Sequence, residues 1–335
     1  MTIETNARSA TEVKNPARYR LCGKVVKSDL RLPSLPMAGG GRPSVVIRRQ
    51  REEAVPRDGG HPIYELVDSA GTLVYRLTRG DGEYLWWYPN VGRFAISADG
   101  GLIRWVARDD SLPDVTAVVA GPILGFALQL QGQVNLHGSA VVIDEQAVGL
   151  LAPSGGGKST MAALLMSRGY RLLTDDVVSL DARSEGVRVL PGYPTLKLWP
   201  DALGHFVDDG DWRRLPRHAS WLDKRVLPAA DLGSVCGSAR PLAALFVLSP
   251  TGPDGDVEVT RLRGKEALLA LVAHGYNAHL LALEPEVLVG QLNLFSRLVG
   301  STPVYVIRCP RALERLNEVA DAVLTHAQPA YRGVL

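Results

Sequence analysis

The sequence predicts an α/β protein: a P-loop core with a mainly parallel sheet flanked by helices, preceded by a β-rich N-terminal domain. Two observations lead to this prediction. From Tyr19 to about Trp105 the chain consists of short β-rich runs separated by turn signals such as Gly80-Asp81-Gly82, a pattern typical of antiparallel hairpins. Residues 135–181 instead contain the order strand, glycine loop, helix, strand, and this order implies parallel strands.

The length of 335 residues exceeds that of one typical domain, and we expect three segments. Residues 1–18 are polar, have no apolar period, and are predicted to form a flexible arm. Residues 19–112 form the β-rich domain, and residues 113–335 form the P-loop core domain. The helix expected at the start of the core contains Gly121-Pro122, which would kink or divide it.

Charge and cysteine content exclude several classes of protein. The chain has 37 Lys and Arg against 35 Asp and Glu, a formal charge of +2, so no strong field attracts nucleic acid or an anionic membrane. Cys22, Cys236 and Cys309 are too widely spaced for a disulfide framework or a metal site. The N-terminus lacks a signal-peptide core, and charge interrupts the apolar stretches. We therefore expect a cytoplasmic protein that binds no nucleic acid and does not insert into membranes.

The strongest motif is Ala-Pro-Ser-Gly-Gly-Gly-Lys-Ser-Thr, which follows an apolar strand and opens a helix. In such a loop the backbone N–H groups and the helix dipole bind phosphate, and glycines permit the close approach. Lys158 would reach the β- and γ-phosphates, and the Ser159 hydroxyl would ligate Mg²⁺. The first glycine of the usual pattern is replaced by Ala152. The predicted nucleotide-binding residues are Ser154, Gly155, Gly156, Gly157, Lys158, Ser159 and Thr160.

Two adjacent carboxylates follow the strand after this helix. Asp175 and Asp176 stand at its carboxyl end, which in a parallel sheet lies beside the phosphate loop. One of them can orient Mg²⁺, and the other can accept a proton from an attacking hydroxyl. His137 opens an apolar run that enters the same sheet, where it could hydrogen-bond a carboxylate or the phosphate.

Taken together, residues 135–181 resemble the catalytic core of the HPr kinase/phosphorylase family. The shared features are His-Gly, an apolar strand, a Ser-Gly-x-Gly-Lys-Ser type of loop, a helix ending in Arg-Gly, and Leu-x-x-Asp-Asp, in this order. The resemblance implies a serine kinase that uses ATP and Mg²⁺. It implies that Asp176 is the general base and that His137 supports it. It also implies that Asp175 and Ser159 hold the metal, while Lys158 contacts the phosphates.

The chain departs from that family at several points. Thr160 stands where an acidic residue is usual, and residues 191–199 replace a segment that supplies a further metal ligand. The opening phrase Tyr19-Arg20-Leu21 is instead similar to divergent HPr-kinase-related proteins, some of which phosphorylate a ribosomally made peptide precursor. The resemblance therefore implies a peptide or protein partner with an acceptor Ser or Thr. It also implies a homo-oligomer, because the related kinases often assemble.

Other candidate residues and functions stay open at this level. Lys197, Lys224 and Arg225 could stabilise transferred phosphate, grip an acidic substrate, or be solvated surface charges. Trp86-Trp87-Tyr88 is expected to be half core and half surface. A nucleotide-sensing protein without catalysis is one alternative. An ABC-type ATPase is another, although no LSGGQ-like signature is present and the aspartates come early.

Overall fold

The computed structural model describes residues 12–56, 62–108, 112–183, 186–207, 211–281 and 283–327. The chain forms two compact units. Unit 1 comprises Met1–Gln133, His218–Leu222 and His279–Val287, and unit 2 comprises Val134–Arg217, Asp223–Ala278 and Leu288–Leu335.

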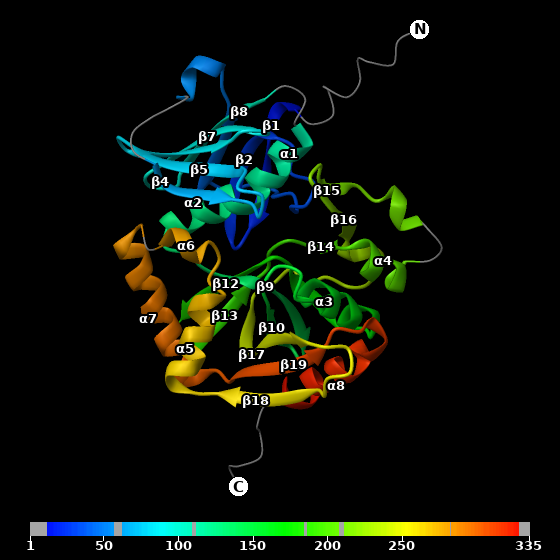
Figure 1. Cartoon of the computed structure of the whole chain (residues 1–335). Helices are drawn as coiled ribbons and strands as arrows, with labels where there is room; N and C mark the ends of the chain where they lie inside the picture. The colour runs from blue at the N-terminus through cyan, green and yellow to red at the C-terminus, as the bar shows by residue number, and fades with distance from the viewer. Residues whose placement is uncertain are drawn as a thin grey trace. The chain divides into compact units, whose positions relative to one another are not determined.

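Unit 1 is built on an eight-stranded sheet, drawn from blue to cyan in Figure 1. The strand order is β1-β2-β3-β8-β7-β6-β5-β4, with β3 parallel to both of its neighbours and every other pair antiparallel. The strands are β1 (Glu12–Leu21), β2 (Lys24–Leu30), β3 (Val45–Arg49), β4 (Pro62–Val67), β5 (Leu73–Gly80), β6 (Glu83–Tyr88), β7 (Gly92–Ser97) and β8 (Leu102–Ala107), and a 3₁₀ turn spans Glu52–Ala54. The predicted antiparallel hairpins are therefore present from β4 to β8.

The predicted N-terminal arm is shorter than expected. Residues 12–18 belong to β1, which pairs with β2 through a two-residue turn at Cys22 and Gly23. Both turn residues have positive φ, 50° and 76°, as a tight hairpin requires. Residues 1–11 of the predicted arm lie outside the described residues.

The helix after β8 is divided as the sequence predicts. Helices α1 (Leu112–Val118) and α2 (Leu124–Leu130) are joined by a π-helical turn over Val119–Ile123, in which Gly121 is non-helical. Phe126 of α2 packs edge-on against Tyr84 and Trp86 of β6. Among the described residues, the stretch from α1 to α2 is the one helix long and apolar enough to cross a membrane, and 78% of its apolar window is buried.

The tryptophan pair of β6 divides as predicted between core and surface. Trp86 and Tyr88 are buried, whereas Trp87, whose side chain points to the opposite face of the strand, is 36% exposed. Trp86 stacks on Tyr75 of β5, with ring centroids 4.9 Å apart.

Unit 2 contains a second sheet, with the strand order β10-β9-β12-β13-β17-β19-β18. In addition, β11 pairs with β9, and β10 pairs with β17. The remaining strands are β9 (Val134–Ile143), β10 (Gln146–Leu151), β11 (Arg171–Thr174), β12 (Val177–Arg183), β13 (Gly186–Leu190), β14 (Thr195–Leu198), β15 (Arg217–Ala219), β16 (Leu222–Pro228), β17 (Arg240–Thr251), β18 (Glu258–Leu262) and β19 (Val304–Pro310). The remaining helices are α3 (Lys158–Ser167), α4 (Pro200–Phe206), α5 (Gly264–Ala273), α6 (Ala278–Leu281), α7 (Pro285–Ser301) and α8 (Leu316–Ala327), with 3₁₀ turns at Asp211–Arg214, Ala229–Asp231 and Leu313–Arg315.

The sheet of unit 2 is mixed, whereas the sequence predicted a mainly parallel one. Strand β17 runs parallel to β10 and to β19, but β9 is antiparallel to β10, β11 and β12. The cause is the turn Asp144-Glu145 between β9 and β10, where both residues have positive φ, 48° and 61°. A two-residue turn of this kind forces the strands into an antiparallel hairpin. Strand β9 therefore lies between β10 and β11, which are joined through α3.

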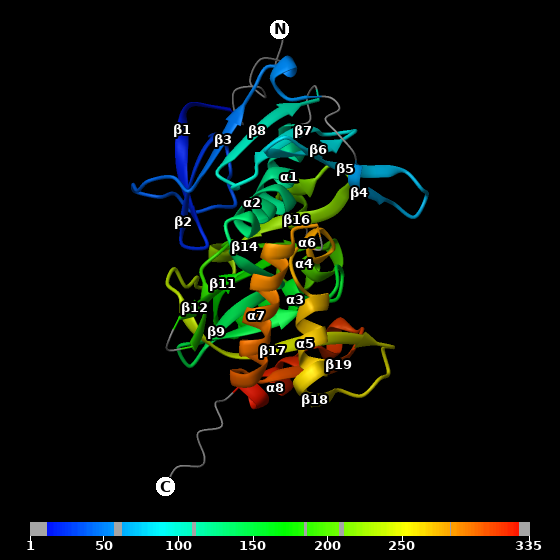
Figure 2. The same cartoon turned by 90° about the vertical axis from the view of Figure 1, so that its left-hand side faces the viewer.

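Helices cover both faces of this sheet (Figure 1). Side chains of α3 and α8 pack with Val141 and Val148 on one face, and side chains of α5 and α7 pack with Ala140 and Val142 on the other. Because neighbouring residues of a strand point to opposite faces, β9 supplies both cores. Figure 2 shows α5 and α7 side by side along their face of the sheet.

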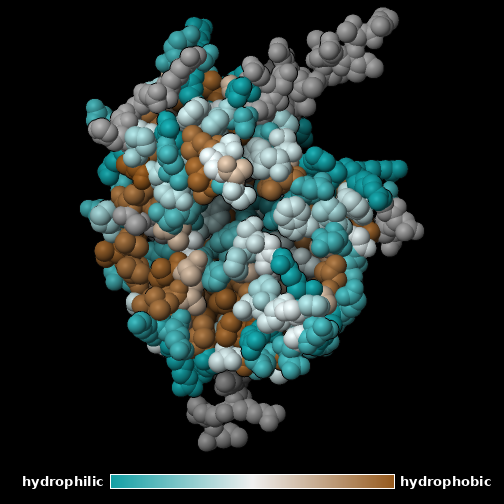
Figure 3. Space-filling view, in the orientation of Figure 1, coloured by the Kyte–Doolittle hydropathy of each residue, from teal (hydrophilic) through white to brown (hydrophobic). Residues whose placement is uncertain are grey.

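The surface of that second face retains apolar side chains. Figure 3 shows apolar surface where α5 and α7 lie in Figure 1. Leu269 of α5 and Val289 of α7 are each 55% exposed. Scattered apolar side chains on the solvent side of helices are ordinary, and this pair by itself assigns no function.

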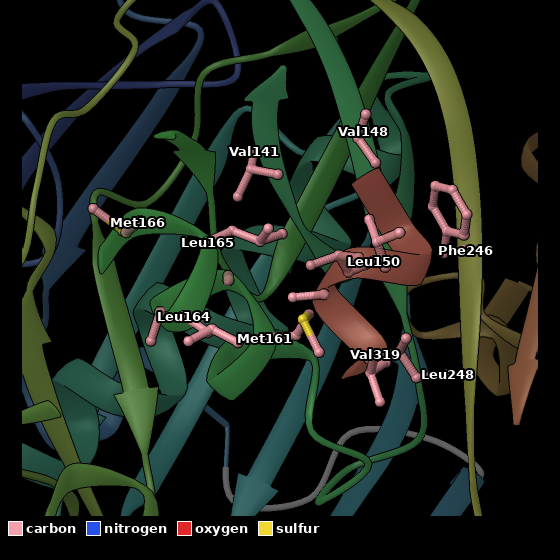
Figure 4. Close-up of a cluster of buried hydrophobic side chains, with 14 of the residues drawn as sticks. Val141, Val148, Leu150, Met161, Leu164, Leu165, Met166, Phe246, Leu248 and Val319 are labelled. Atoms are coloured by element: carbon pink, nitrogen blue, oxygen red, sulfur yellow. The ribbon is translucent and has the colours of Figure 1, made fainter. Parts of the chain in front are cut away.

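The core beneath α3 holds the phosphate loop in place. Figure 4 shows Met161 and Leu165 of α3 among Val141, Val148 and Leu150 of the sheet, with Phe246 and Leu248 of β17 nearby. All seven side chains are buried, at 2% exposure or less. The loop is thus anchored at both ends, by β10 before it and by α3 after it.

Candidate functional site

The glycine loop joins β10 to α3 and has the geometry of an anion-binding turn. Gly155 and Gly157 have positive φ, 78° and 89°, and Gly157 is the N-cap of α3. At Gly156 a Cβ atom would stand 2.7 Å from the Cβ of Ala152, so a side chain there would clash. No side chain caps the first turn of α3, and its N–H groups face outward with the positive end of the helix dipole behind them.

Ala152, which replaces the usual first glycine, is fully buried in the core beside α3. Its methyl group occupies the space against which Gly156 packs. The departure from the motif is therefore accommodated by the core without displacing the turn at Gly155 and Gly157.

The remaining predicted loop residues differ in their exposure. Lys158 is buried, and its Nζ lies 3.4 Å from the carbonyl oxygen of Pro153. Burial lowers the pKa of Lys158, although Asp176 and Asp175 act in the opposite direction. Thr160 lines the cavity beside the loop, whereas Ser154 is exposed and does not line it.

Asp175 lies at the interruption between β11 and β12 and is the centre of a hydrogen-bond cluster. Its Oδ1 accepts hydrogen bonds from the hydroxyls of Ser139, at 2.6 Å, and Ser159, at 2.8 Å. Its Oδ2 accepts one from the backbone N–H of Lys197, at 3.2 Å. The carboxylate is 1% exposed, so these three donors hold it rigidly next to the first turn of α3.

Asp176 is the next residue, and its backbone has a left-handed conformation with φ of 70°. Its Oδ2 accepts a hydrogen bond of 2.7 Å from Nζ of Lys197, and its Oδ1 lies 3.4 Å from Nδ1 of His137. Burial would raise the pKa of this carboxyl, but Lys197, His137 and Lys158 together hold it well below its usual value. Asp176 is therefore a carboxylate at any physiological pH.

His137 of β9 lies opposite the two aspartates. Its Nδ1 is 3.1 Å from the carbonyl oxygen of Asp176, so the tautomer with its proton on Nδ1 donates to that oxygen. Burial lowers the pKa of His137, which favours the neutral ring. Its backbone N–H donates to the carbonyl oxygen of His274. Burial also lowers the pKa of the His274 imidazole.

Several residues of the site were not singled out from the sequence. Ser139 lies two residues after His137 on β9 and donates a hydrogen bond to Asp175. Because residues two apart in a strand lie on the same face, this spacing could have indicated that Ser139 belongs to the site. Tyr193 pairs with Asp175 through its backbone, and its segment brings Lys197 to the carboxylates. Lys197 and Lys224 belong to strands β14 and β16, which pair with each other. The sequence did not decide whether these lysines belong to the site or are solvated surface charges.

A cavity of about 630 Å³ opens in front of the loop, within unit 2. One side is formed by residues 155–161, together with Lys197 and Lys224. The other side is largely apolar and includes Leu248, Pro250, Cys309, Pro310, Ala312, Leu313, Leu316 and Val319. Its size suits a nucleotide, with phosphates at the loop and a base against the apolar wall.

The residues present also suit a magnesium ion. Among the described residues, no three His, Cys, Asp or Glu side chains gather into a metal-binding group. Ser159 and Asp175 do provide a hydroxyl and a carboxylate 2.8 Å apart, next to the phosphate loop. Mg²⁺ prefers such oxygen ligands, few in number and completed by phosphate and water.

No protein-family model matches the chain. Two curated proteins called HPr kinase/phosphorylase, from the Eklund 17B and Alaska E43 strains of Clostridium botulinum, are each 38% identical to it over 78 residues. The matched stretch covers 23% of this chain and 24% of each relative, so the chain spans about a quarter of their length.

A solved structure of the Hpr(Ser) kinase/phosphatase from Coxiella burnetii aligns with 57% of this chain and 95% of its own. The identity in that alignment is 12% and the TM-score is 0.33. The similarity in sequence to the clostridial proteins agrees with the resemblance read from residues 135–181. Over those 78 residues the chain is similar to HPr kinase/phosphorylase.

Proposed function

We propose that unit 2 is a P-loop kinase that transfers the γ-phosphoryl group of ATP to a Ser or Thr hydroxyl of a peptide or protein. The observation that carries the proposal is the position of the two aspartates. Asp175 accepts a hydrogen bond from the loop residue Ser159, and the adjacent Asp176 pairs with Lys197, which lines the cavity, although neither aspartate lines it directly. A phosphate-binding turn and a second, ionised carboxylate are thus held together.

The chain's own residues divide the work in this proposal. The N–H groups of Gly155–Lys158 and the ammonium of Lys158 bind the β- and γ-phosphates. Ser159 and Asp175 would hold Mg²⁺, which would neutralise part of the negative charge of the phosphates. Catalysis then consists mainly of positioning and charge stabilisation.

Asp176 is the proposed general base. Lys197 occupies its Oδ2, so Oδ1, beside His137, is the oxygen that can accept the proton of the incoming hydroxyl. The hydroxyl oxygen bonds to the γ-phosphorus, the bond from that phosphorus to the bridging oxygen breaks, and ADP leaves. A carboxylate with a low pKa suffices here, because the proton is transferred late in a loose transition state.

The proposal extends to the acceptor, the location in the cell and the assembly of the protein. The acceptor is a peptide or protein rather than a nucleic acid, and a ribosomally made precursor peptide is the class implied by the resemblance. We propose a cytoplasmic location and assembly of several copies on the same basis.

The test uses the full chain with labelled ATP, Mg²⁺ and a panel of synthetic peptides, each with one Ser or Thr. Asp176→Asn should keep ATP affinity within about threefold, and should lose at least about 100-fold in transfer rate, since general base catalysis contributes 10²–10⁴. Asp254→Asn, an exposed carboxylate of unit 2, is the matched control and should change neither.

Other outcomes decide between the proposed kinase and the alternatives. If the wild-type protein binds ATP but neither hydrolyses it nor transfers phosphate to any acceptor, the nucleotide-sensing function replaces the kinase. Hydrolysis without transfer, unaffected by Asp176→Asn, would indicate an ATPase instead.

A further inference from the structure

Three lysine side chains line one cavity wall, and each has a different environment. Nζ of Lys158 lies near the carbonyl oxygen of Pro153, and Nζ of Lys197 pairs with Asp176. Within the part of the chain that the structure describes, Lys224 makes no ion pair. Its Nζ instead lies 5.3 Å from the ring centroid of Trp199.

The pairing of β14 with β16 explains why Lys224 stands there. Leu198 of β14 lies opposite Arg225 of β16, so the next step along this antiparallel ladder places Trp199 opposite Lys224. Lys197 and Trp199, two residues apart, lie on the same side of the strand, and all three side chains line the cavity. The ladder thus presents Lys224 to the cavity on regular structure.

The charges around Lys224 are not balanced by the protein itself. Lys158, Lys197 and Lys224 are three ammonium groups beside two carboxylates, Asp175 and Asp176, and the charges of Asp201 and Arg311, which also line the cavity, offset each other. Burial lowers the pKa of Lys224, Asp176 and Asp175 act in the opposite direction, and the charge of Lys197 adds a smaller lowering effect. A half-buried ammonium that makes no direct ion pair among the described residues is stabilised when an anion enters the cavity.

We propose that Lys224, supported by Trp199, forms a subsite for the terminal phosphate of the bound nucleotide. This inference rests on the proposed function and adds a phosphate-binding residue from outside the loop. Lys158 reaches the phosphates from the loop side, whereas Lys224 reaches them from the β14–β16 side of the same cavity. A polyphosphate bound between Lys158 and Lys224 is contacted by a cation on each side. In this arrangement Lys224 contacts the terminal phosphate.

The test is calorimetric binding of ATP and of ADP, each with Mg²⁺, to the full chain. Lys224→Met should weaken ATP binding about 10- to 100-fold, the loss expected for a charged hydrogen bond, and should weaken ADP binding less than about threefold. Lys158→Met should weaken both nucleotides. Lys265→Met, an exposed lysine of unit 2, is the matched control and should weaken neither. Lys224→Arg keeps the charge and should restore part of the ATP affinity.

The failures are distinguishable. If the wild-type protein binds no ATP, the proposed function itself is wrong. If Lys158→Met loses ATP while Lys224→Met binds it like the wild type, the subsite is wrong and the phosphate loop stands. Unchanged ATP affinity with a raised KM for an acceptor peptide would also overturn the subsite, because Lys224 would then grip the acceptor.

A second measurement needs no variant. Acetylation of wild-type lysines by N-hydroxysuccinimidyl acetate, followed by mass spectrometry, reports how accessible each amine is. ATP should slow modification of Lys224 at least about fivefold relative to ADP, since a bound phosphate blocks the amine and keeps it protonated. Lys265 should react at the same rate with either nucleotide. Equal rates for Lys224 with ATP and ADP would overturn the proposal.

Discussion

The Nζ of Lys197 lies 2.7 Å from Oδ2 of Asp176, and the side chains are only 12% and 19% exposed. The lysine comes from β14 and the aspartate from the break between β11 and β12, 21 residues earlier in the sequence. This ion pair joins two segments of unit 2 at the centre of the candidate site. Against the effect of burial, it acts with His137 and Lys158 to hold the pKa of Asp176 well below its usual value.

The first prediction concerns the energy of this pair. Lys197→Met leaves a largely buried carboxylate without its main partner, and it should lower the free energy of unfolding by about 3 kcal/mol at pH 7. Because the pKa of Asp176 is lowered in the folded state, the contribution of the pair is complete above the unfolded value near 3.9. It is lost as the pH falls below that value. Urea unfolding at pH 7 and pH 3 measures both effects.

A double-mutant cycle with Asp176→Asn gives the control for that experiment. The two substitutions should couple, since each removes the same contact. Additive effects at pH 7 would show that the pair contributes nothing to stability. Lys265→Met should leave unfolding unchanged.

The second prediction compares two buried serines on neighbouring strands. Ser139 donates to Asp175, whereas the Ser179 hydroxyl has no hydrogen-bond partner among the described residues. Ser139→Ala should cost about 1–3 kcal/mol of stability, because it removes a bond to a buried charge. Ser179→Ala should be neutral or slightly stabilising. Equal losses in chemical denaturation would contradict the role of Asp175 as the centre of the cluster.

The third prediction tests the backbone of the phosphate loop. Gly157 has a φ of 89°, and a Cβ there would meet no atom within 4 Å, so Gly157→Ala introduces strain without a clash. It should destabilise the protein by about 1–2 kcal/mol. Gly290 is exposed on α7 and also has open space around it, and Gly290→Ala should instead stabilise by about 1 kcal/mol. Thermal unfolding of both variants distinguishes conformational strain from a general intolerance of alanine.

The fourth prediction concerns pH and His137. Since burial lowers the pKa of His137, the unfolded chain binds more protons than the folded one just below pH 6.5. The free energy of unfolding should therefore rise with pH from about 5 to 6.5. His137→Gln should reduce this slope, while His274, whose pKa is lowered in the same way, keeps part of it. His326→Gln, on the exposed side of α8, is the control, and an unchanged slope in His137→Gln would refute the assignment.

Some features could be predicted because they depend on residues close together in the chain. The kink at Gly121-Pro122 arises because Pro122 has no backbone N–H to donate and its ring clashes with the preceding turn of the helix. The placement of Trp87 on the surface follows from strand alternation. The closeness of Asp175 to Ser159 followed from strand, loop and helix order, even though the predicted parallel sheet was mixed.

Other features could not be read from local patterns. The two-residue turn at Asp144-Glu145 made β9 and β10 a hairpin, but an apolar run of this length is also typical of parallel strands. Lys197 and Lys224 lie in polar, irregular segments without periodicity. Their charges alone fitted a solvated surface as well as a phosphate site.

The sequence by itself determined the glycine loop, the pair of aspartates and the similarity to HPr kinases. These depend on glycine conformation and on the spacing of a few residues, and both are local properties. The tertiary structure alone decided which charges surround Asp176. Strand pairing between residues far apart in the sequence brings Lys197, Lys224 and His137 around it, and burial in that cluster lowers the pKa of Lys224 and of His137.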